Sequence, residues 1–275
     1  MDANTIRFSV FLGVFLSMLL LERLIPRHPL VDSKPRRLAI NLAITGLDIL
    51  AGRLAFGAAA VGAAQFAQEK GWGVLNYWDL PSWLEFLLTL VFLDLMIYIQ
   101  HVVVHMVPFF WRFHVVHHSD LDLDVSSGLR FHPVEILGSM LYKVGLVLLL
   151  GPAPLAAMTF EAVLNGMSQF THSNIRLPAP LDNALRWAFV TPDMHRIHHS
   201  VEARETNSNF GFNLSLWDRL LGTYIHDAAK PQPEIVIGVE FFRKPGDVSF
   251  LNLMTMPFRD NITQAYTNSP RSRRG

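Results

Sequence analysis

The sequence contains no cysteine among its 275 residues. Disulfide bonds, iron–sulfur clusters and thiolate metal sites are therefore excluded within this chain. Charged residues are also scarce, at 17% compared with about a quarter in an average soluble domain. The 23 basic and 23 acidic residues cancel, so no excess of positive charge indicates a nucleic-acid partner. With a mean hydropathy of +0.27, this composition favours a membrane protein.

Long apolar stretches give the first structural signal. Four are long enough to form helices in a membrane, where roughly twenty residues cross the bilayer: 6–21, 38–67, 83–100 and 134–170. The first lacks a basic leader and a small-residue cleavage site, so we expect a retained membrane anchor rather than a signal peptide. The last is interrupted by GPAP at 151–154, which predicts a helical hairpin that returns to its starting side. A pair of packed core helices is the alternative.

These stretches predict an all-α fold, a membrane bundle of about three spans plus the hairpin. Basic residues predict its orientation, because they cluster between the first two stretches, at Arg23, Arg27, Lys34, Arg36 and Arg37. The loop 70–82 is nearly uncharged. The preference of cytoplasmic loops for positive charge places the first loop in the cytoplasm. The third span then returns the chain to the cytoplasmic side at His101, and the hairpin keeps the remainder there.

Two charges lie inside the predicted hairpin. Lys143 precedes Pro152 by nine residues and Glu161 follows it by nine, so both side chains would lie at a similar depth. Because an unpaired charge in a membrane is costly, we predict that they form an ion pair. Two side chains that extend separately toward the interface are the alternative.

No internal repeat or linker divides the chain, and the sequence becomes mixed polar from about residue 176. We therefore treat residues 1–275 as a single domain. Its parts would be membrane-anchoring spans in 1–80, a histidine-rich core in 90–226 and a cytoplasmic C-terminal tail in 227–275.

Histidines are concentrated in three groups with helical spacing, and their residues three or four apart share one face of a helix. The first is HVVVH and the other two have the pattern HxxHH, so the members are His101, His105, His114, His117, His118, His195, His198 and His199. Each group should direct two or three ring nitrogens into one volume. Two more histidines, His132 in RFHPVE and His172 in QFTHSN, are candidates for the same site.

One isolated histidine is usually a packed core residue, but three such groups on one predicted side of the membrane indicate metal binding. Eight to ten imidazoles exceed the ligands that one ion accepts, so we expect two ions with four or five ligands each. Imidazole suits zinc, copper, iron and nickel, and the ligands alone do not choose among them. Asp94 and Tyr98 share a helix face with His101 and His105, so either could orient a ligand imidazole. Asp94 could instead pair elsewhere in the bundle.

Six runs together resemble the fatty acid hydroxylase superfamily, also called the sterol desaturase family, over roughly 90–226. They are DLMIYIQHVVVH, WRFHVVHHSD, LRFHPVE, QFTHSNIRLP, TPDMHRIHHS and NFGFNLSLWDRLLGTY. The resemblance implies an integral membrane oxygenase with a histidine-bound di-iron centre. Such enzymes use dioxygen and two external electrons to hydroxylate, or sometimes desaturate, an unactivated C–H bond of a lipid.

The resemblance assigns the eight histidines of the three groups as metal ligands and catalytic residues, and His172 as a further ligand. Fatty acyl 2-hydroxylases of this superfamily carry another histidine four residues later, where this chain has Arg176. The sterol-oxidising branch carries a histidine at the position of His132. We therefore predict that His132 supplies the missing ligand or lies just outside the metal-bound residues.

The implied cofactors are two iron ions, for which zinc could substitute in purified protein, with dioxygen as co-substrate. The implied partners are a lipid substrate, the membrane and an external electron donor, because the chain has no cysteine for a cluster of its own. A ferredoxin, a cytochrome or a reductase would dock on the cytoplasmic face of the inner membrane. Sterols, fatty acyl chains, carotenoids and ether lipids all stay open as substrates. The alternatives are a membrane metal-binding or transport protein and a haem electron carrier.

Overall fold

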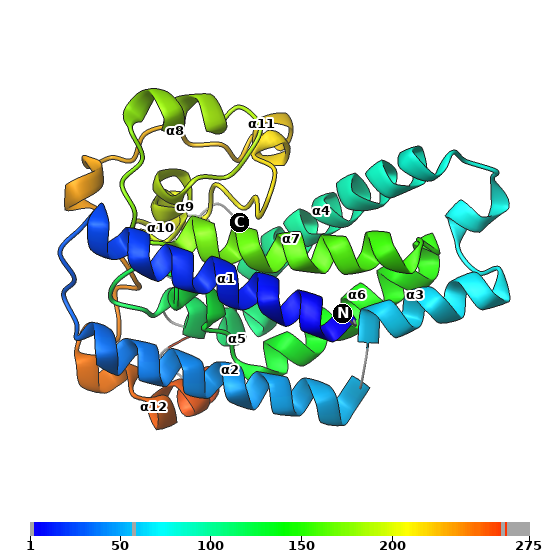
Figure 1. The fold of residues 1–275 in the computed structure, drawn as a ribbon. Helices are drawn as coiled ribbons and strands as arrows, with labels where there is room; N and C mark the ends of the chain where they lie inside the picture. Colours follow the sequence, from blue (N-terminus) through cyan, green and yellow to red (C-terminus); the bar gives the residue numbers. More distant parts are fainter. Residues whose placement is uncertain (1–2, 57–58, 260–261, 263–275) are drawn as a thin grey trace.

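The computed structural model describes all residues except 1–2, 57–58, 260–261 and 263–275, so the end of the predicted tail lies outside the described residues. Within the described part, the chain forms helices and no strand, as the all-α prediction requires. The long helices are α1 (Ala3–Leu24), α2 (Lys34–Phe56), α3 (Ala59–Lys70), α4 (Ser82–Met106), α6 (Pro133–Leu150) and α7 (Pro154–His172). They lie side by side and make up the bundle in Figure 1.

The shorter elements lie mainly at one end of this bundle (Figure 1). They are α5 (Pro108–His118), α8 (Ala179–Leu185), α9 (Pro192–His198), α10 (Ala203–Thr206), α11 (Leu216–Leu221) and α12 (Phe250–Thr255). Single 3-10 turns are η1 (Val74–Tyr77), η2 (Ser127–Leu129), η3 (Gln232–Glu234), η4 (Pro245–Val248) and η5 (Met256–Phe258). Of these turns, η1 lies near the opposite end, between α3 and α4.

Four segments are long and apolar enough to cross a membrane: Thr5–Leu24, Lys34–Tyr77, Ser82–Met106 and Pro133–Leu150. They coincide with the predicted spans and with the first half of the predicted hairpin. Many of their large side chains point outward, among them Phe8, Leu54 and Leu87, as expected where lipid is the solvent. The chain is therefore an integral membrane protein.

The predicted hairpin is present, since α6 ends at Leu150 and α7 begins at Pro154. Gly151 between them has a φ of 68°, the left-handed conformation that glycine adopts without strain. The two helices are separated by α3, whose small side chains Ala60 and Ala64 pack between Val147 of α6 and Ala157 of α7. The hairpin is thus open, with a third helix between its arms.

This arrangement explains why the predicted ion pair between Lys143 and Glu161 does not form. Glu161 pairs with Arg7 of α1 instead, at 2.6 Å from the guanidinium. Helix α1 packs along α7, which brings Arg7 next to Glu161. Helix α3 lies between α6 and α7 and keeps Lys143 away from Glu161. Lys143 makes no ion pair with any described residue. The prediction was correct that Glu161 needs a partner and wrong about which residue supplies it.

The C-terminal segment belongs to the same hydrophobic core as the histidine helices. Val248, Leu253 and Met256 pack against Trp111 and Val115 of α5. A second cluster joins Ile235 and Ile237 to Ile197 of α9. The described part of 227–275 therefore packs over α5 and α9 and holds these two helices in place.

Candidate metal centre

Nine of the ten predicted ligands meet in two buried groups at one end of the bundle. The first group is His101, His105, His114, His118 and His198, and the second is His117, His172, His195 and His199. Within each group, the candidate ligand atoms all lie within 4.8 Å of one another. The numbers match the expectation of two ions with four or five ligands each.

Each HxxHH box is divided between the two groups, which corrects the prediction that a box serves one volume. In α5, His114 and His118 belong to the first group and His117 to the second. In α9 and at its C-cap, His195 and His199 belong to the second group and His198 to the first. Residues four apart lie about 40° apart around a helix, whereas the intervening histidine points about 60° from the first of them and about 100° from the last. Both short helices therefore lie between the two groups and serve both.

The spacing of the ring nitrogens in the second group fits a metal ion. The Nε2 atom of His172 lies 3.1 Å from that of His117 and 3.0 Å from that of His195, and the Nε2 atoms of His195 and His199 are 3.2 Å apart. Nitrogens bound at about 2.1 Å to one ion would be roughly 3.0 to 3.4 Å apart in octahedral or tetrahedral geometry.

Unpartnered ring nitrogens support the same interpretation for the first group. The Nε2 atoms of His101, His114 and His198 are buried without a hydrogen-bond partner, as are both ring nitrogens of His105 and His118. A buried polar atom without a partner is unfavourable by about 1–3 kcal/mol. Because imidazole nitrogens bind transition metals, so many unpartnered nitrogens in one place suit a metal ion that they would share.

Burial also keeps these imidazoles in the form that binds metal. It lowers the pKa of His117, His118, His195 and His199 well below the usual value, and that of His198 to about 3. Their close mutual approach lowers the pKa further in the first four. The rings are therefore neutral at pH 7, with lone pairs available for coordination.

Hydrogen bonds to the second ring nitrogen set the direction of several rings. The Nδ1 atoms of His101, His198 and His172 each lie 2.7 Å from a backbone carbonyl oxygen, those of Phe210, Ser208 and Ser168 respectively. A neutral imidazole that donates from Nδ1 presents its Nε2 lone pair on the opposite side. All three Nε2 atoms consequently face the groups.

Glu135 fixes a fourth ring, because its Oε1 accepts a hydrogen bond of 2.6 Å from His114 Nδ1. Such a carboxylate orients a ligand imidazole and makes it more basic. The sequence signal was the acidic residue in the first turn of a helix beginning at Pro133. From the sequence, we considered His132, three residues earlier, and not Glu135.

His132 lies outside both groups and packs against Phe113, so the structure favours the second part of the prediction, a position just outside the metal-bound residues. It is the N-cap of α6, where its Nδ1 accepts from the backbone N–H of Val134 at 3.2 Å. Its Nε2 lies 3.3 Å from the carbonyl oxygen of Met254. With both nitrogens engaged in this way, the ring joins α6 to α12.

The expected role of Asp94 and Tyr98 is also corrected, because neither contacts a ligand imidazole. Asp94 accepts from Asn213 Nδ2 at 2.7 Å and from Trp217 Nε1 at 2.8 Å, and the hydroxyl of Tyr98 bonds that of Thr223. Both residues attach α4 to the segment NFGFNLSLWDRLLGT. The alternative considered for Asp94, pairing elsewhere in the bundle, is the correct one.

That segment supplies the Phe210 carbonyl group that orients His101, and Asp218 holds the segment in shape. The Asp218 carboxylate accepts from the backbone N–H groups of Phe210 at 2.7 Å and Gly211 at 2.9 Å. Burial raises the pKa of Asp218 to about 6, although these bonds favour its charged form. Asp218 thus positions the Phe210 carbonyl on His101. Sequence reasoning assigned it no role.

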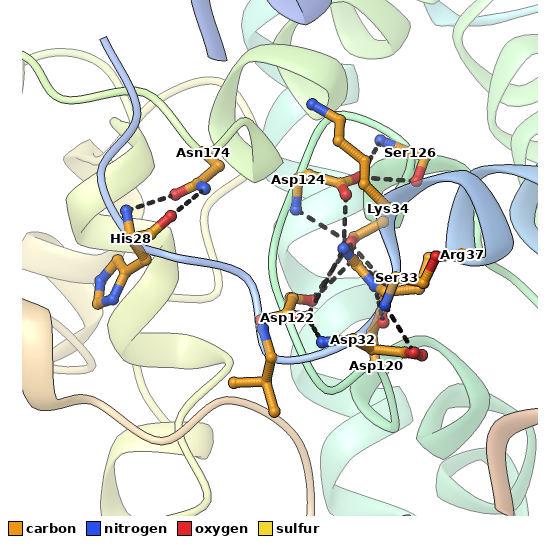
Figure 2. Close-up of polar contacts among 12 residues, drawn as sticks. His28, Asp32, Ser33, Lys34, Arg37, Asp120, Asp122, Asp124, Ser126 and Asn174 are labelled. Atoms are coloured by element: carbon orange, nitrogen blue, oxygen red, sulfur yellow. Dashed lines mark hydrogen bonds and ion pairs between the residues drawn. The ribbon is translucent and has the colours of Figure 1, made fainter. Parts of the chain in front are cut away.

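A buried network of charges holds the other side of the site (Figure 2). Arg37 binds Asp120 through two nitrogens, both at 2.8 Å, and Asp124 at 2.6 Å. Asp122 accepts from the backbone N–H groups of Val31 and Asp32 at 2.8 Å each. The acidic run that follows the second histidine box is thereby joined to the loop between α1 and α2.

Three more basic residues, in that loop and at the start of α2, also form ion pairs. Arg27 pairs with Asp193, Lys34 with Glu22, and Arg36 with Asp32. The same charges that predict a cytoplasmic loop are therefore structural partners of the site.

A cavity of about 880 Å³ connects the first group to the interior of the bundle. It reaches His101 and His114 at one end and extends among α1, α2, α4, α6 and α7. Its walls are mainly apolar and include Phe11, Ile97 and Leu164. A chain-like apolar molecule could reach the histidines through it without crossing water.

Several known proteins are similar to this chain in sequence. Ornithine lipid hydroxylase of Rhizobium tropici is 37% identical over 153 residues, 55% of this chain and 44% of the relative. Alkylglycerol monooxygenase of Caenorhabditis elegans is 29% identical over 195 residues, 68% of this chain and 37% of the relative. Human cholesterol 25-hydroxylase is 28% identical over 139 residues, 50% of each chain. The chain thus spans half or less of the length of these relatives.

No solved structure matches the chain. The family model for fatty acid hydroxylases matches residues 86–223, which is half of the chain and contains all nine histidines of the two groups. The resemblance of the six sequence runs and the helical histidine site lead to the same conclusion: this chain belongs to the fatty acid hydroxylase family.

Proposed function

We propose that this protein is a membrane-bound, dioxygen-dependent di-iron oxygenase that hydroxylates, or desaturates, a C–H bond of a lipid. The observation that carries the proposal is the pair of buried imidazole groups at the end of a cavity that enters the membrane bundle. The named relatives are hydroxylases and monooxygenases, and the family model covers the part of this chain that contains both histidine groups.

In this proposal, His101, His105, His114, His118 and His198 hold one iron ion, and His117, His172, His195 and His199 hold the other. Iron bound there would supply the redox chemistry that activates dioxygen. Zinc could occupy the same imidazoles in purified protein. The hydroxylation balances as R–H + O₂ + 2 e⁻ + 2 H⁺ giving R–OH + H₂O.

The residues of this chain orient the reactants and exclude water. The histidines of the two groups are buried at 3% exposure or less, so bulk water has no direct access to the reacting C–H bond. The cavity would align the lipid with the first group. Both electrons would come from a separate ferredoxin, cytochrome or reductase on the cytoplasmic face of the inner membrane.

The test combines metal content with lipid analysis. Purified protein should contain about two iron ions per chain, and cells that express it should contain a lipid heavier by one oxygen or lighter by two hydrogens. His117→Ala should lower the metal content and abolish the lipid change, because it removes a ligand of the second group. His226→Ala changes a half-exposed histidine outside both groups and should leave both readings intact. Full activity in His117→Ala would refute the proposal.

A further inference from the structure

The cavity has a charged end far from the histidines. Glu135, Ser139 and Lys143 are spaced four residues apart on α6, and all three line the cavity. At 1.5 Å per residue, Lys143 lies about 12 Å further along the helix than Glu135, the partner of His114. The cavity therefore extends from the metal centre to Lys143 along one face of α6.

Lys143 shares this end with Arg7 and Glu161, which also line the cavity. Arg7 and Glu161 pair with each other at 2.6 Å, so their charges cancel. Both act electrostatically on Lys143, but no described residue gives its ammonium a hydrogen bond or an ion pair. These three side chains leave one net positive charge at this end of the cavity, while Asp48, Arg53 and Glu135 line other parts of it.

An ammonium at this depth in a bundle is unfavourable unless an acceptor compensates it. Apolar side chains of the lining, such as Phe11, Ile97 and Leu164, suit a hydrocarbon chain. A molecule with an anionic oxygen group at one end and an apolar chain would satisfy both features. A neutral lipid would leave the ammonium without a partner, and a cationic lipid would repel it.

We propose that the cavity binds an acidic lipid whose carboxylate or phosphate is held by Lys143. The C–H bond presented to the first histidine group would then lie on the order of 10 Å from that anionic group. This inference rests on the proposed function, because it assigns the cavity to the substrate.

Binding of chain-matched probes tests the inference. The full-length, metal-containing protein in detergent is titrated with dodecanoate, dodecyl phosphate and dodecanol, with affinity measured by calorimetry. At least one of the two anions should bind about ten-fold or more tightly than dodecanol, as expected for one charge-assisted hydrogen bond. The tighter anion identifies the carboxylate or the phosphate as the source.

Variants assign the preference to Lys143. Lys143→Met should abolish the difference between anion and alcohol, whereas Lys143→Arg should keep it. Lys70→Met, an exposed lysine outside the cavity, is the matched control and should bind like the wild type. Equal binding of dodecanol and both anions to wild type would overturn the inference, as would unchanged anion binding by Lys143→Met. Because the wild-type comparison needs no variant, a misfolded variant does not prevent the test.

The binding measurement is separate from catalysis, because no electron donor is present and no turnover occurs. If anions bind through Lys143 but no cellular lipid gains an oxygen or loses two hydrogens, the proposed function fails and the acidic-lipid site stands. If lipids are hydroxylated but binding ignores charge, the inference fails and the proposed function stands.

Discussion

At the scale of single residues, the hydrogen bond to the second ring nitrogen separates metal-facing histidines from structural ones. His172 donates from Nδ1 to the Ser168 carbonyl and directs Nε2 toward His117 and His195. His132 instead uses Nδ1 as an acceptor at the start of α6. Two histidines with equally suggestive sequence contexts thus have different roles.

This difference predicts opposite results for two alanine variants. His172→Ala should reduce the iron content, because it removes one of four ligands from the second group. His132→Ala should keep both iron ions and lower the free energy of unfolding by about 1 kcal/mol, the usual effect of losing an N-cap. Iron analysis and thermal unfolding in detergent measure the two effects. His132→Asn, which keeps a capping side chain, should recover most of the stability; iron loss in His132→Ala would contradict the assignment.

Helical spacing predicted eight of the nine histidines in the two groups, because residues three or four apart share a helix face, and the family resemblance added His172. The sequence could not separate His132 from His172, since capping and coordination use the same ring nitrogens. Glu135 and Asp218 were missed for a related reason. Their function depends on which imidazole or backbone carbonyl lies opposite them, and that partner is 21 residues from Glu135 in the sequence.

At the scale of elements, the network around Arg37 joins the start of α2 to the loop between α5 and η2 (Figure 2). Arg37, Asp120 and Asp124 are each about 1% exposed. Breaking a buried ion pair leaves an uncompensated charge, so the loop after the second histidine box depends on this arginine.

Arg37→Met should therefore destabilise the protein by about 3–5 kcal/mol. Arg36→Met is a control on the neighbouring residue. Its guanidinium pairs with Asp32 and is about one-third exposed, so its loss should cost about 1 kcal/mol or less. Denaturant unfolding of the two variants measures the difference. Adding Asp120→Asn and Asp124→Asn to Arg37→Met should recover part of the loss, and equal effects of the two arginine variants would contradict the role of the network.

The elements themselves were largely predictable, because apolar length and GPAP determine spans and a turn. Which helices pack against one another was not predictable from the sequence. The stretch 38–67 is divided between α2 and α3, and the small residues of α3 lie between α6 and α7. That packing depends on which faces fit together, and it explains why Glu161 pairs with Arg7 rather than with Lys143.

At the scale of the whole molecule, the histidine site and the loop between α3 and α4 lie at opposite ends of the bundle (Figure 1). The proposed orientation puts the site in the cytoplasm and that loop outside. Because the sequence has no cysteine, a single introduced thiol can be labelled without background.

Asp79→Cys in the outer loop should react with a membrane-impermeant maleimide in spheroplasts. Asp227→Cys, at a side chain that is 87% exposed beside the site, should react only after the membrane is opened. The fraction of labelled protein is measured for each variant before and after the membrane is opened, and the cysteine-free wild type serves as the blank. The reverse labelling pattern would place the site outside the cell.

The division of each histidine box between two groups also has a consequence for biosynthesis. Neither group is complete until α9 and its C-cap have been made, since they supply His198 to one group and His195 and His199 to the other. During translation, a nascent chain that ends before α9 would carry six of the nine imidazoles without a complete site for either ion. The proposed metal ions can therefore bind their full ligand sets only late in membrane assembly, after α9 and His199 have been made.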